Sequence, residues 1–263
     1  MIEGYAESEF TWDGVTRPVY RRGQGPGVIV MHEIPGIHPT VIRFANWVVD
    51  AGFTVVMPEL MGQANRAVTP GYTLGSMLRA CIRREFAVLA AHRSSPITDW
   101  LRALCRETHR DLGGAGVGAV GMCLTGNFAL AMMLEPSLLA PVLSQPSMPF
   151  PLGKTRRAAL HLSPEELEAV RERARQGCPV LGLRFTEDRW VPPERFETLR
   201  REIGDRFEAI EIDSAVSRPS ENPAGPHSVL TEDLRDEDGH PTVAARDRVL
   251  EFLRERLVDG PRP

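Results

Sequence analysis

The chain has 263 residues, of which 42% are apolar, and its 31 basic and 35 acidic residues give a formal charge of -4. A chain of this length and composition can bury a large hydrophobic core, so we expect a single domain over residues 1–263. The interspersed charges predict no nucleic-acid partner. Because the first residues lack a signal-peptide pattern and no apolar run could span a bilayer, we expect a cytoplasmic location and no membrane partner.

Short β-rich segments alternate with helical patterns along the chain. Two polar-alternating runs around Asp13-Gly14 predict an antiparallel hairpin within residues 8–23. Further strands are predicted at 27–33, 53–59, 116–121, 140–144, 179–185 and 207–213. Helices are predicted at 40–52, 75–93, 97–110, directly after Cys123, at 163–177, 193–204 and 242–257. Strands separated by helices of this length predict an α/β fold with a mostly parallel sheet covered on both faces.

Chemically active side chains follow several of the predicted strands. Parallel sheets place their ligand sites beyond the carboxyl ends of the strands. The residues at these positions are Glu33, Cys123, Asp188 and His227. A thiol, carboxylates and an imidazole on one side of a sheet include the parts of a nucleophile, a base and an acid that orients the base.

Cys123 lies in "GMCLTG", where a strand passes directly into a helix. The apex of so tight a turn is strained, and the residues two positions away must be small, which Gly121 satisfies and the bulkier Thr125 does not. A thiol at a helix N-terminus is stabilised as a thiolate and lies near N–H groups that can hold an oxyanion. Most free cysteines are small buried hydrophobes, and that is the alternative for Cys123. The other cysteines, at 81, 105 and 178, lack this setting, so we predict a nucleophile.

The predicted base and acid each have an alternative. Of the seven histidines, His227 lies in the long segment after the last predicted strand, where the order nucleophile, acid, histidine requires the base, and His240 directly precedes the last predicted helix. The alternative is a solvated loop histidine. For the acid, Asp188 in "FTEDRWVP" is preferred to its neighbour Glu187, and either carboxylate is otherwise an ordinary charge before a helix. No cysteine pair or Cys/His cluster has zinc-ligand spacing, so no metal is expected.

Five segments in this order resemble the dienelactone hydrolase family of α/β-hydrolases. They are "VIVMHEIPGI", "GFTVVMPEL", "GMCLTG", "FTEDRWVP" and "GPHSV", and the resemblance covers about residues 25–255. It implies an α/β-hydrolase fold and a hydrolase of carboxylic esters or lactones that needs no cofactor. It further implies that Cys123 attacks the carbonyl to form an acyl-thioenzyme, that His227 transfers protons and that Asp188 orients the imidazole.

The resemblance also assigns roles around the nucleophile. It implies that Glu33 contacts the resting thiol, keeps it neutral through like-charge repulsion and helps to deprotonate it when substrate arrives. The backbone N–H groups of Ile34 and Leu124 are implied as the oxyanion hole. The arginines that hold a substrate carboxylate in the family have no clear counterpart among Arg66, Arg79, Arg83 and Arg84. Loops at about 58–74, 145–162 and 213–226 are expected to wall the pocket, with Trp190 and Phe150 as apolar lining.

Two other functions are compatible with the sequence. One is a non-catalytic ligand-binding or sensing protein on the same fold, in which Thr125 and the unplaced arginines mark a lost site. The other is a redox-responsive thiol protein, which the lack of a neighbouring resolving cysteine disfavours. For the hydrolase, the expected partner is a small-molecule ester or lactone, and the expected assembly is a monomer or a small homo-oligomer.

Overall fold

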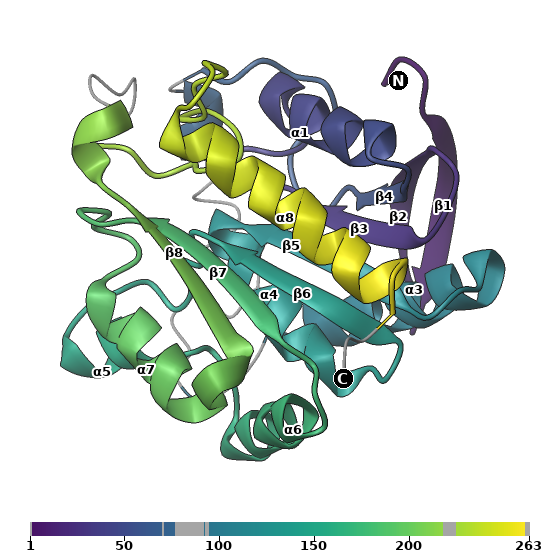
Figure 1. Cartoon of the computed structure of the whole chain (residues 1–263). Helices are drawn as coiled ribbons and strands as arrows, with labels where there is room; N and C mark the ends of the chain where they lie inside the picture. The colour runs from purple at the N-terminus through teal and green to yellow at the C-terminus, as the bar shows by residue number, and fades with distance from the viewer. Residues whose placement is uncertain (1, 70, 77–91, 93–94, 218–224, 261–263) are drawn as a thin grey trace.

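The computed structural model describes residues 2–69, 71–76, 92, 95–217 and 225–260, and these form an eight-stranded sheet with helices against both faces (Figure 1). The strands are β1 (Ala6–Trp12), β2 (Val15–Arg22), β3 (Gly27–Met31), β4 (Thr54–Pro58), β5 (Val117–Met122), β6 (Leu138–Ser144), β7 (Val180–Phe185) and β8 (Phe207–Ile212). The α-helices are α1 (Pro39–Asp50), α3 (Ile97–Leu112), α4 (Gly126–Ala131), α5 (Lys154–Ala158), α6 (Pro164–Arg175), α7 (Pro193–Ile203) and α8 (Pro241–Leu257).

The strand order is β1-β2-β4-β3-β5-β6-β7-β8. Only the pairings of β2 with β1 and with β4 are antiparallel, and the other pairings are parallel. The predicted α/β fold with an antiparallel edge hairpin is therefore confirmed. The hairpin turns at Asp13 and Gly14, whose φ angles of 48° and 74° match the left-handed pair that a tight two-residue turn requires.

The two faces of the sheet bury separate hydrophobic clusters. Alternate residues of β3 point to opposite faces, so that Ile29 belongs to one cluster and Val28 to the other. Helices α3, α4, α6 and α7 cover the first face, and α1 and α8 cover the second. Figure 1 shows α8 running across the front of the sheet with α1 beside it. Because both faces are covered, β3, β4 and β5 are buried throughout, as their near-continuous apolar sequences require.

Most predicted elements are present with small shifts at their ends, and two differ. The helix expected after Cys123 is broken into a 3-10 turn (Cys123–Thr125), the short α4 and a second 3-10 turn (Met132–Leu134). Helix α5 lies inside the segment 145–162, where we expected only a loop, because its short polar sequence has no apolar periodicity. The expected helix 75–93 falls largely outside the described residues, although residues 71–76 are helical. None of the described helices is long and apolar enough to cross a membrane.

Candidate active site

Cys123 occupies a strained backbone position at the end of β5. Its φ angle is +54°, in the left-handed region that residues with a Cβ rarely adopt. Gly121 makes the turn possible, because a Cβ there would lie 2.2 Å from the carbonyl oxygen of Thr125. Gly126 is packed as closely, since its Cβ would lie 2.7 Å from Cα of Pro146. The turn therefore holds the thiol at the carboxyl edge of the sheet with little freedom.

Thr125 fits this turn because its side-chain hydroxyl forms hydrogen bonds with nearby backbone N–H and C=O groups. The Thr125 side chain is fully buried, and its Oγ1 accepts a hydrogen bond from the N–H of Met122 at 2.9 Å. The same hydroxyl lies 3.0 Å from the carbonyl oxygen of Met122, 3.1 Å from that of Met31 and 3.2 Å from that of His32, and its proton is shared among these acceptors. The threonine therefore ties the nucleophile turn to the end of β3, and it does not mark a disrupted site.

The environment of Cys123 differs from that of the other described cysteines. Cys105 and Cys178 are buried and Cys123 is partly exposed, while Cys81 lies outside the described residues. Burial raises the pKa of the Cys105 thiol to about 12 and also raises the pKa of Cys178. The Sγ of Cys123 lies 3.3 Å from Oγ of Ser147, a buried residue whose N–H donates to the Cys123 carbonyl at 3.0 Å. Among these thiols, only that of Cys123 is open to a reagent.

His227 and Asp188 form a buried pair. Nδ1 of His227 donates to Oδ2 of Asp188 at 2.7 Å, and the other carboxylate oxygen accepts from the N–H of Trp190 at 2.9 Å. Burial is the largest influence on His227 and lowers its pKa, but Asp188 and the Cys123 thiol together raise it well above the ordinary value. Glu187, the alternative acid, is exposed. The geometry therefore joins the predicted acid, Asp188, to the predicted histidine, with Cys123 acting on the same ring.

Asp233 holds the backbone that carries His227. Its Oδ2 accepts hydrogen bonds from the N–H groups of His227 at 2.7 Å and of Ser228 at 2.9 Å. A carboxylate that accepts from two successive N–H groups fixes the conformation of the loop locally. Asp233 lacks the strand-end position that singled out the other candidates, and it is recognisable only once the loop is folded.

Glu33 lies in a polar cluster beyond β3, and among the described residues its carboxylate makes no hydrogen bond with the Cys123 thiol. Its carboxylate is buried, with 2% of the residue exposed. The side-chain donors around it are Ser228 Oγ at 2.7 Å, Gln145 Nε2 at 3.2 Å, Thr231 Oγ1 and His38 Nε2 at 3.5 Å. Among the described residues, the hydrogen bond found at the Cys123 thiol joins Sγ to Oγ of Ser147 and not to the Glu33 carboxylate. The contact between Glu33 and the resting thiol that the resemblance implies is therefore absent from this arrangement.

The electrostatic state of Glu33 follows from these donors. Burial is the largest influence and raises the pKa of Glu33, but hydrogen bonds from His38 and Thr231 and the charges of His38 and His227 bring the pKa below its ordinary value. Glu33 is accordingly an ionised carboxylate within the protein. The sequence gives no local signal for its partners, because they come from loops that are far apart along the chain.

His32 fixes the backbone on the other side of Glu33. Its Nε2 accepts from the N–H of Leu60 at 3.0 Å, so Nδ1 carries the proton and donates to the carbonyl oxygen of Glu33 at 2.9 Å. Burial lowers the pKa of His32 to about 4, which keeps this imidazole neutral. The neutral imidazole of His32 therefore links the end of β3 to the loop that follows β4 through one hydrogen bond to each.

The two backbone groups expected to form the oxyanion hole lie at matching positions past neighbouring strands. β3 and β5 pair in parallel, with Met31 opposite Gly121. Ile34 and Leu124 each follow by three positions along the chain. Ile34 and Cys123 also pack against the same hydrophobic cluster. The register thus brings the peptide after Glu33 and the peptide after Cys123 to the same edge of the sheet.

Two aromatic side chains, one from the loop after β6 and one from the loop after β7, pack together near the turn that carries Cys123. The rings of Phe150 and Trp190 pack with centroids 5.6 Å apart, and both side chains border the cluster that includes the base of the nucleophile turn. The buried guanidinium of Arg195 donates to the carbonyl oxygens of Pro146 at 2.8 Å and Pro149 at 2.6 Å, which holds the loop after β6 in place. Arg66 stacks 4.0 Å from the ring centroid of Tyr72. The other arginines considered for substrate binding, Arg79, Arg83 and Arg84, lie outside the described residues.

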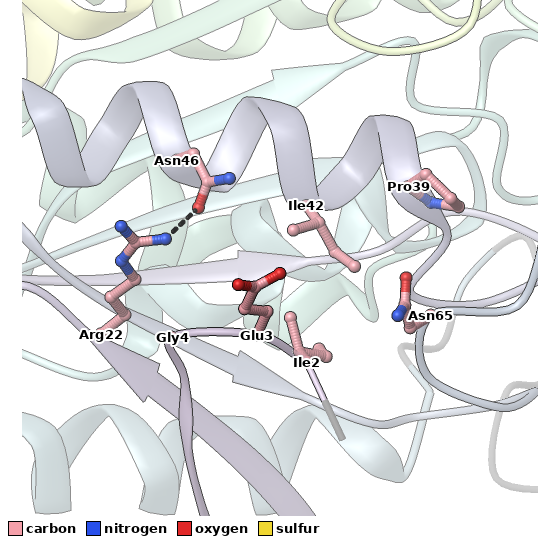
Figure 2. Close-up of a pocket in the computed structure, with 8 residues that line it drawn as sticks. All are labelled: Ile2, Glu3, Gly4, Arg22, Pro39, Ile42, Asn46 and Asn65. Carbon is pink, nitrogen blue, oxygen red and sulfur yellow. Dashed lines mark hydrogen bonds between the residues drawn. The ribbon is translucent and has the colours of Figure 1, made fainter.

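A separate pocket lies at the N-terminal side of α1. It has a volume of about 440 Å³ and is lined by residues 2–4, Arg22, Asn46 and neighbouring side chains (Figure 2). Arg22 donates to Asn46 Oδ1 at 3.1 Å across its floor. Neither Cys123 nor His227 lines this pocket, so it is not the candidate active site. The described residues contain no cluster of His, Cys, Asp and Glu that could hold a metal ion.

The sheet order and the strained turn after β5 define an α/β-hydrolase. A sequence model of the dienelactone hydrolase family matches residues 15–253, and the chain belongs to that family.

Solved structures show the same fold. A candidate dienelactone hydrolase from Klebsiella pneumoniae is 18% identical, with a TM-score of 0.66 over 95% of this chain and 98% of that one. Dienelactone hydrolase from Anabaena variabilis is 13% identical, with a TM-score of 0.60 over 97% of this chain and 100% of that one. An epoxide hydrolase from Caballeronia sordidicola is 27% identical over 112 residues, which are 39% of this chain and 34% of the relative. The chain thus spans about a third of the length of that curated relative.

Proposed function

We propose that this protein hydrolyses small carboxylic esters or lactones through an acyl-thioenzyme formed on Cys123. The observation that carries the proposal is the hydrogen bond of 2.7 Å between His227 and Asp188, on an imidazole that also interacts with the strained thiol. A nucleophile, a base and an orienting acid in mutual contact are the requirements for this chemistry. Family membership supports the same reaction class.

The first half of the reaction uses a thiolate and an imidazolium. Because the pKa of His227 is raised well above its ordinary value, the proton of the Cys123 thiol is favourably held on the imidazole. The thiolate attacks the carbonyl carbon, an S–C bond forms, and the N–H groups of Ile34 and Leu124 stabilise the resulting oxyanion. The C–O bond then breaks, and His227 gives its proton to the departing alkoxide oxygen. In a lactone this oxygen stays attached to the acyl group.

The second half restores the enzyme with one water. The neutral imidazole takes a proton from the water, whose oxygen attacks the thioester carbonyl. The S–C bond breaks and the carboxylic acid leaves, which regenerates the thiolate beside the imidazolium. Asp188 keeps Nδ1 of His227 protonated through both halves, so that Nε2 is the atom that exchanges protons with thiol, alkoxide and water.

Glu33 acts on the Cys123 thiolate and the His227 imidazolium through its negative charge. The carboxylate feels the positive charge of His227, and a buried negative charge in turn favours the imidazolium. Direct proton transfer between Glu33 and Cys123 requires a contact that the hydrogen bonds of the resting site do not contain. We therefore assign Glu33 to electrostatic support of His227.

The proposal is tested with 4-nitrophenyl acetate and simple lactones as substrates. Cys123→Ala should lose nearly all hydrolysis, and a substrate incubated with the wild-type protein should add its acyl mass to the peptide that contains residue 123. Cys178→Ala is the matched control, because that thiol is buried away from the site. Turnover by Cys123→Ala at the wild-type rate, or labelling elsewhere, would contradict the assignment.

A further inference from the structure

The sequence His-Pro-Thr-Val occurs twice, at residues 38–41 and 240–243, and begins a helix each time. His38 precedes α1 and His240 precedes α8, with extended backbone in both cases. Identical four-residue sequences at the starts of two helices form an internal comparison. Any difference between the two imidazoles comes from their surroundings.

His240 behaves as an ordinary helix cap. Its Nδ1 lies 2.7 Å from Oγ1 of Thr242 and accepts from the N–H of the same residue at 3.3 Å, and its Nε2 faces the carbonyl oxygen of Val216 at 3.1 Å. Nε2 therefore carries the proton and Nδ1 is the acceptor, which is a neutral imidazole. Capping α8 requires this neutral tautomer.

His38 has the reverse arrangement. Its side chain makes no capping hydrogen bond with the start of α1. Nδ1 lies 2.9 Å from Oγ1 of Thr40, whose hydroxyl proton is donated to Glu232, so the threonine oxygen is an acceptor for Nδ1. On the other side, Nε2 lies 3.5 Å from Oε1 of Glu33. Nδ1 thus faces a hydrogen-bond acceptor, and Nε2 makes no hydrogen bond but lies at ion-pair distance from a carboxylate, so this arrangement favours the doubly protonated imidazolium.

The charges around His38 agree with this geometry. Glu232 Oε1 lies 3.3 Å from Nδ1, and this side chain is 39% exposed, whereas those of His38 and Glu33 are 1% and 3% exposed. Burial is the largest influence and lowers the pKa of His38, but Glu232 and Glu33 together raise it to about 9. The nearby His32 is neutral, and Glu33 also faces His227. Glu232, His38 and Glu33 thus form a row of carboxylate, imidazole and carboxylate that runs inward from the surface, and Glu33 interacts electrostatically with His227.

We propose that His38 and Glu232 are positioning residues of the hydrolase: the charged imidazole, held by Glu232 at the surface, keeps Glu33 ionised beside His227. The effect of these residues on hydrolysis rests on the proposed function, whereas the charge of His38 does not. Without the imidazolium, Glu33 would be a buried carboxylate with neutral donors alone, and such a carboxylate takes up a proton at higher pH. The Glu33 charge that favours the protonated His227 would then be lost as the pH falls.

The charge of His38 can be measured without substrate. In a proton NMR titration of the imidazole Hε1 signals, with His38 assigned by its loss in His38→Gln, we expect a midpoint near 9 in the wild type. Glu232→Gln changes only a partly exposed side chain and should lower this midpoint by about one unit or more, since a near opposite charge shifts a pKa by about 1–3 units. His240→Gln should leave it unchanged. A midpoint near about 6.5 in the wild type, or none of the expected movement in Glu232→Gln, would overturn the inference.

The catalytic consequence appears in the pH dependence of kcat/KM for 4-nitrophenyl acetate. In His38→Gln the acidic limb should move to higher pH by about one unit or more, because Glu33 becomes protonated earlier. His240→Gln removes an imidazole from the same four-residue motif and should keep the wild-type profile. Superimposable profiles for His38→Gln and the wild type would reject the role of His38. Full activity of Cys123→Ala rejects the proposed function instead and leaves the NMR result to decide the charge of His38.

Discussion

The hydroxyl of Thr125 lies 3.1 Å from the carbonyl oxygen of Met31, and this contact joins the turn that carries Cys123 to the strand that leads to Glu33. The two segments, which carry candidate catalytic residues, follow different strands, and the threonine bridges them inside the protein. The residue that departs from the usual glycine of the turn is therefore part of its construction.

Replacing Thr125 by valine should destabilise the fold and slow hydrolysis. Valine keeps the shape but leaves the buried N–H of Met122 without its acceptor, which costs about 1–3 kcal/mol of unfolding free energy. Urea unfolding measures the loss. Thr125→Ser keeps the hydroxyl and removes one methyl group, so it should lose about 1 kcal/mol or less and retain its rate. Equal stability of the two variants would show that the hydrogen bonds do not matter.

Replacing Ser147 by alanine should make the Cys123 thiol less acidic. The Ser147 hydroxyl lies 3.3 Å from Sγ and donates to the thiolate form, which it favours over the thiol. We expect the rate of alkylation by iodoacetamide at neutral pH to fall about tenfold, which corresponds to about 1.4 kcal/mol. Ser147→Thr keeps a hydroxyl at the position and serves as the control. An unchanged pH dependence of alkylation in Ser147→Ala would exclude this role.

Replacing Asp188 by asparagine should reduce kcat by about 10²–10⁴-fold, because the imidazole then loses the acceptor that fixes its tautomer. Asp188 also raises the pKa of His227, so the variant should lose the imidazolium at lower pH than the wild type. The rate of alkylation of Cys123 by iodoacetamide, measured across pH, reports the pH range in which the thiolate and the His227 imidazolium are both present. Glu187→Gln alters the exposed neighbouring carboxylate and should leave kcat and the profile as in the wild type.

The sequence was sufficient to place the candidate nucleophile, acid and base because Cys123 and Asp188 closely follow the ends of strands and His227 lies in the segment after the last strand. An abrupt change from an apolar strand to a small-residue turn is a local signal, and Cys123 carries it in "GMCLTG". Parallel order then brings the ends of β5, β7 and β8 to one edge of the sheet. The chain order of these elements therefore held enough information to bring Asp188 and His227 together.

The side chains that contact Glu33 and the Cys123 thiol could not be predicted from the sequence in the same way. Ser147 faces Cys123 only because the loop after β6 folds back over α4, and Glu232 meets His38 from the segment before α8. Such contacts depend on loop conformations, which hydrophobic periodicity does not encode. The repeated His-Pro-Thr-Val motif was available as a sequence signal, but it predicts only two helix starts. The difference between His38 and His240 arises from tertiary contacts with carboxylates.

The protein should lose stability as the pH rises from about 7 to 10. The folded-state pKa of His38 is raised to about 9, above the unfolded value of about 6.5, so its contribution is fully present below the unfolded pKa and is lost as the pH passes through 9. The raised pKa of His227 acts in the same direction. Since Glu232 is partly screened by solvent, we expect His38 to account for a fall on the order of 2 kcal/mol in urea unfolding free energy.

Glu232→Gln separates the His38 contribution to this decline from that of His227. Without the outer carboxylate the folded-state pKa of His38 lies closer to the unfolded value, so less stability is present at neutral pH and the decline begins at lower pH. His240→Gln, at the cap of α8, removes a neutral imidazole and should shift the whole curve without changing its shape. Parallel curves for Glu232→Gln and the wild type between pH 6 and 10 would mean that His38 carries no charge in the folded protein.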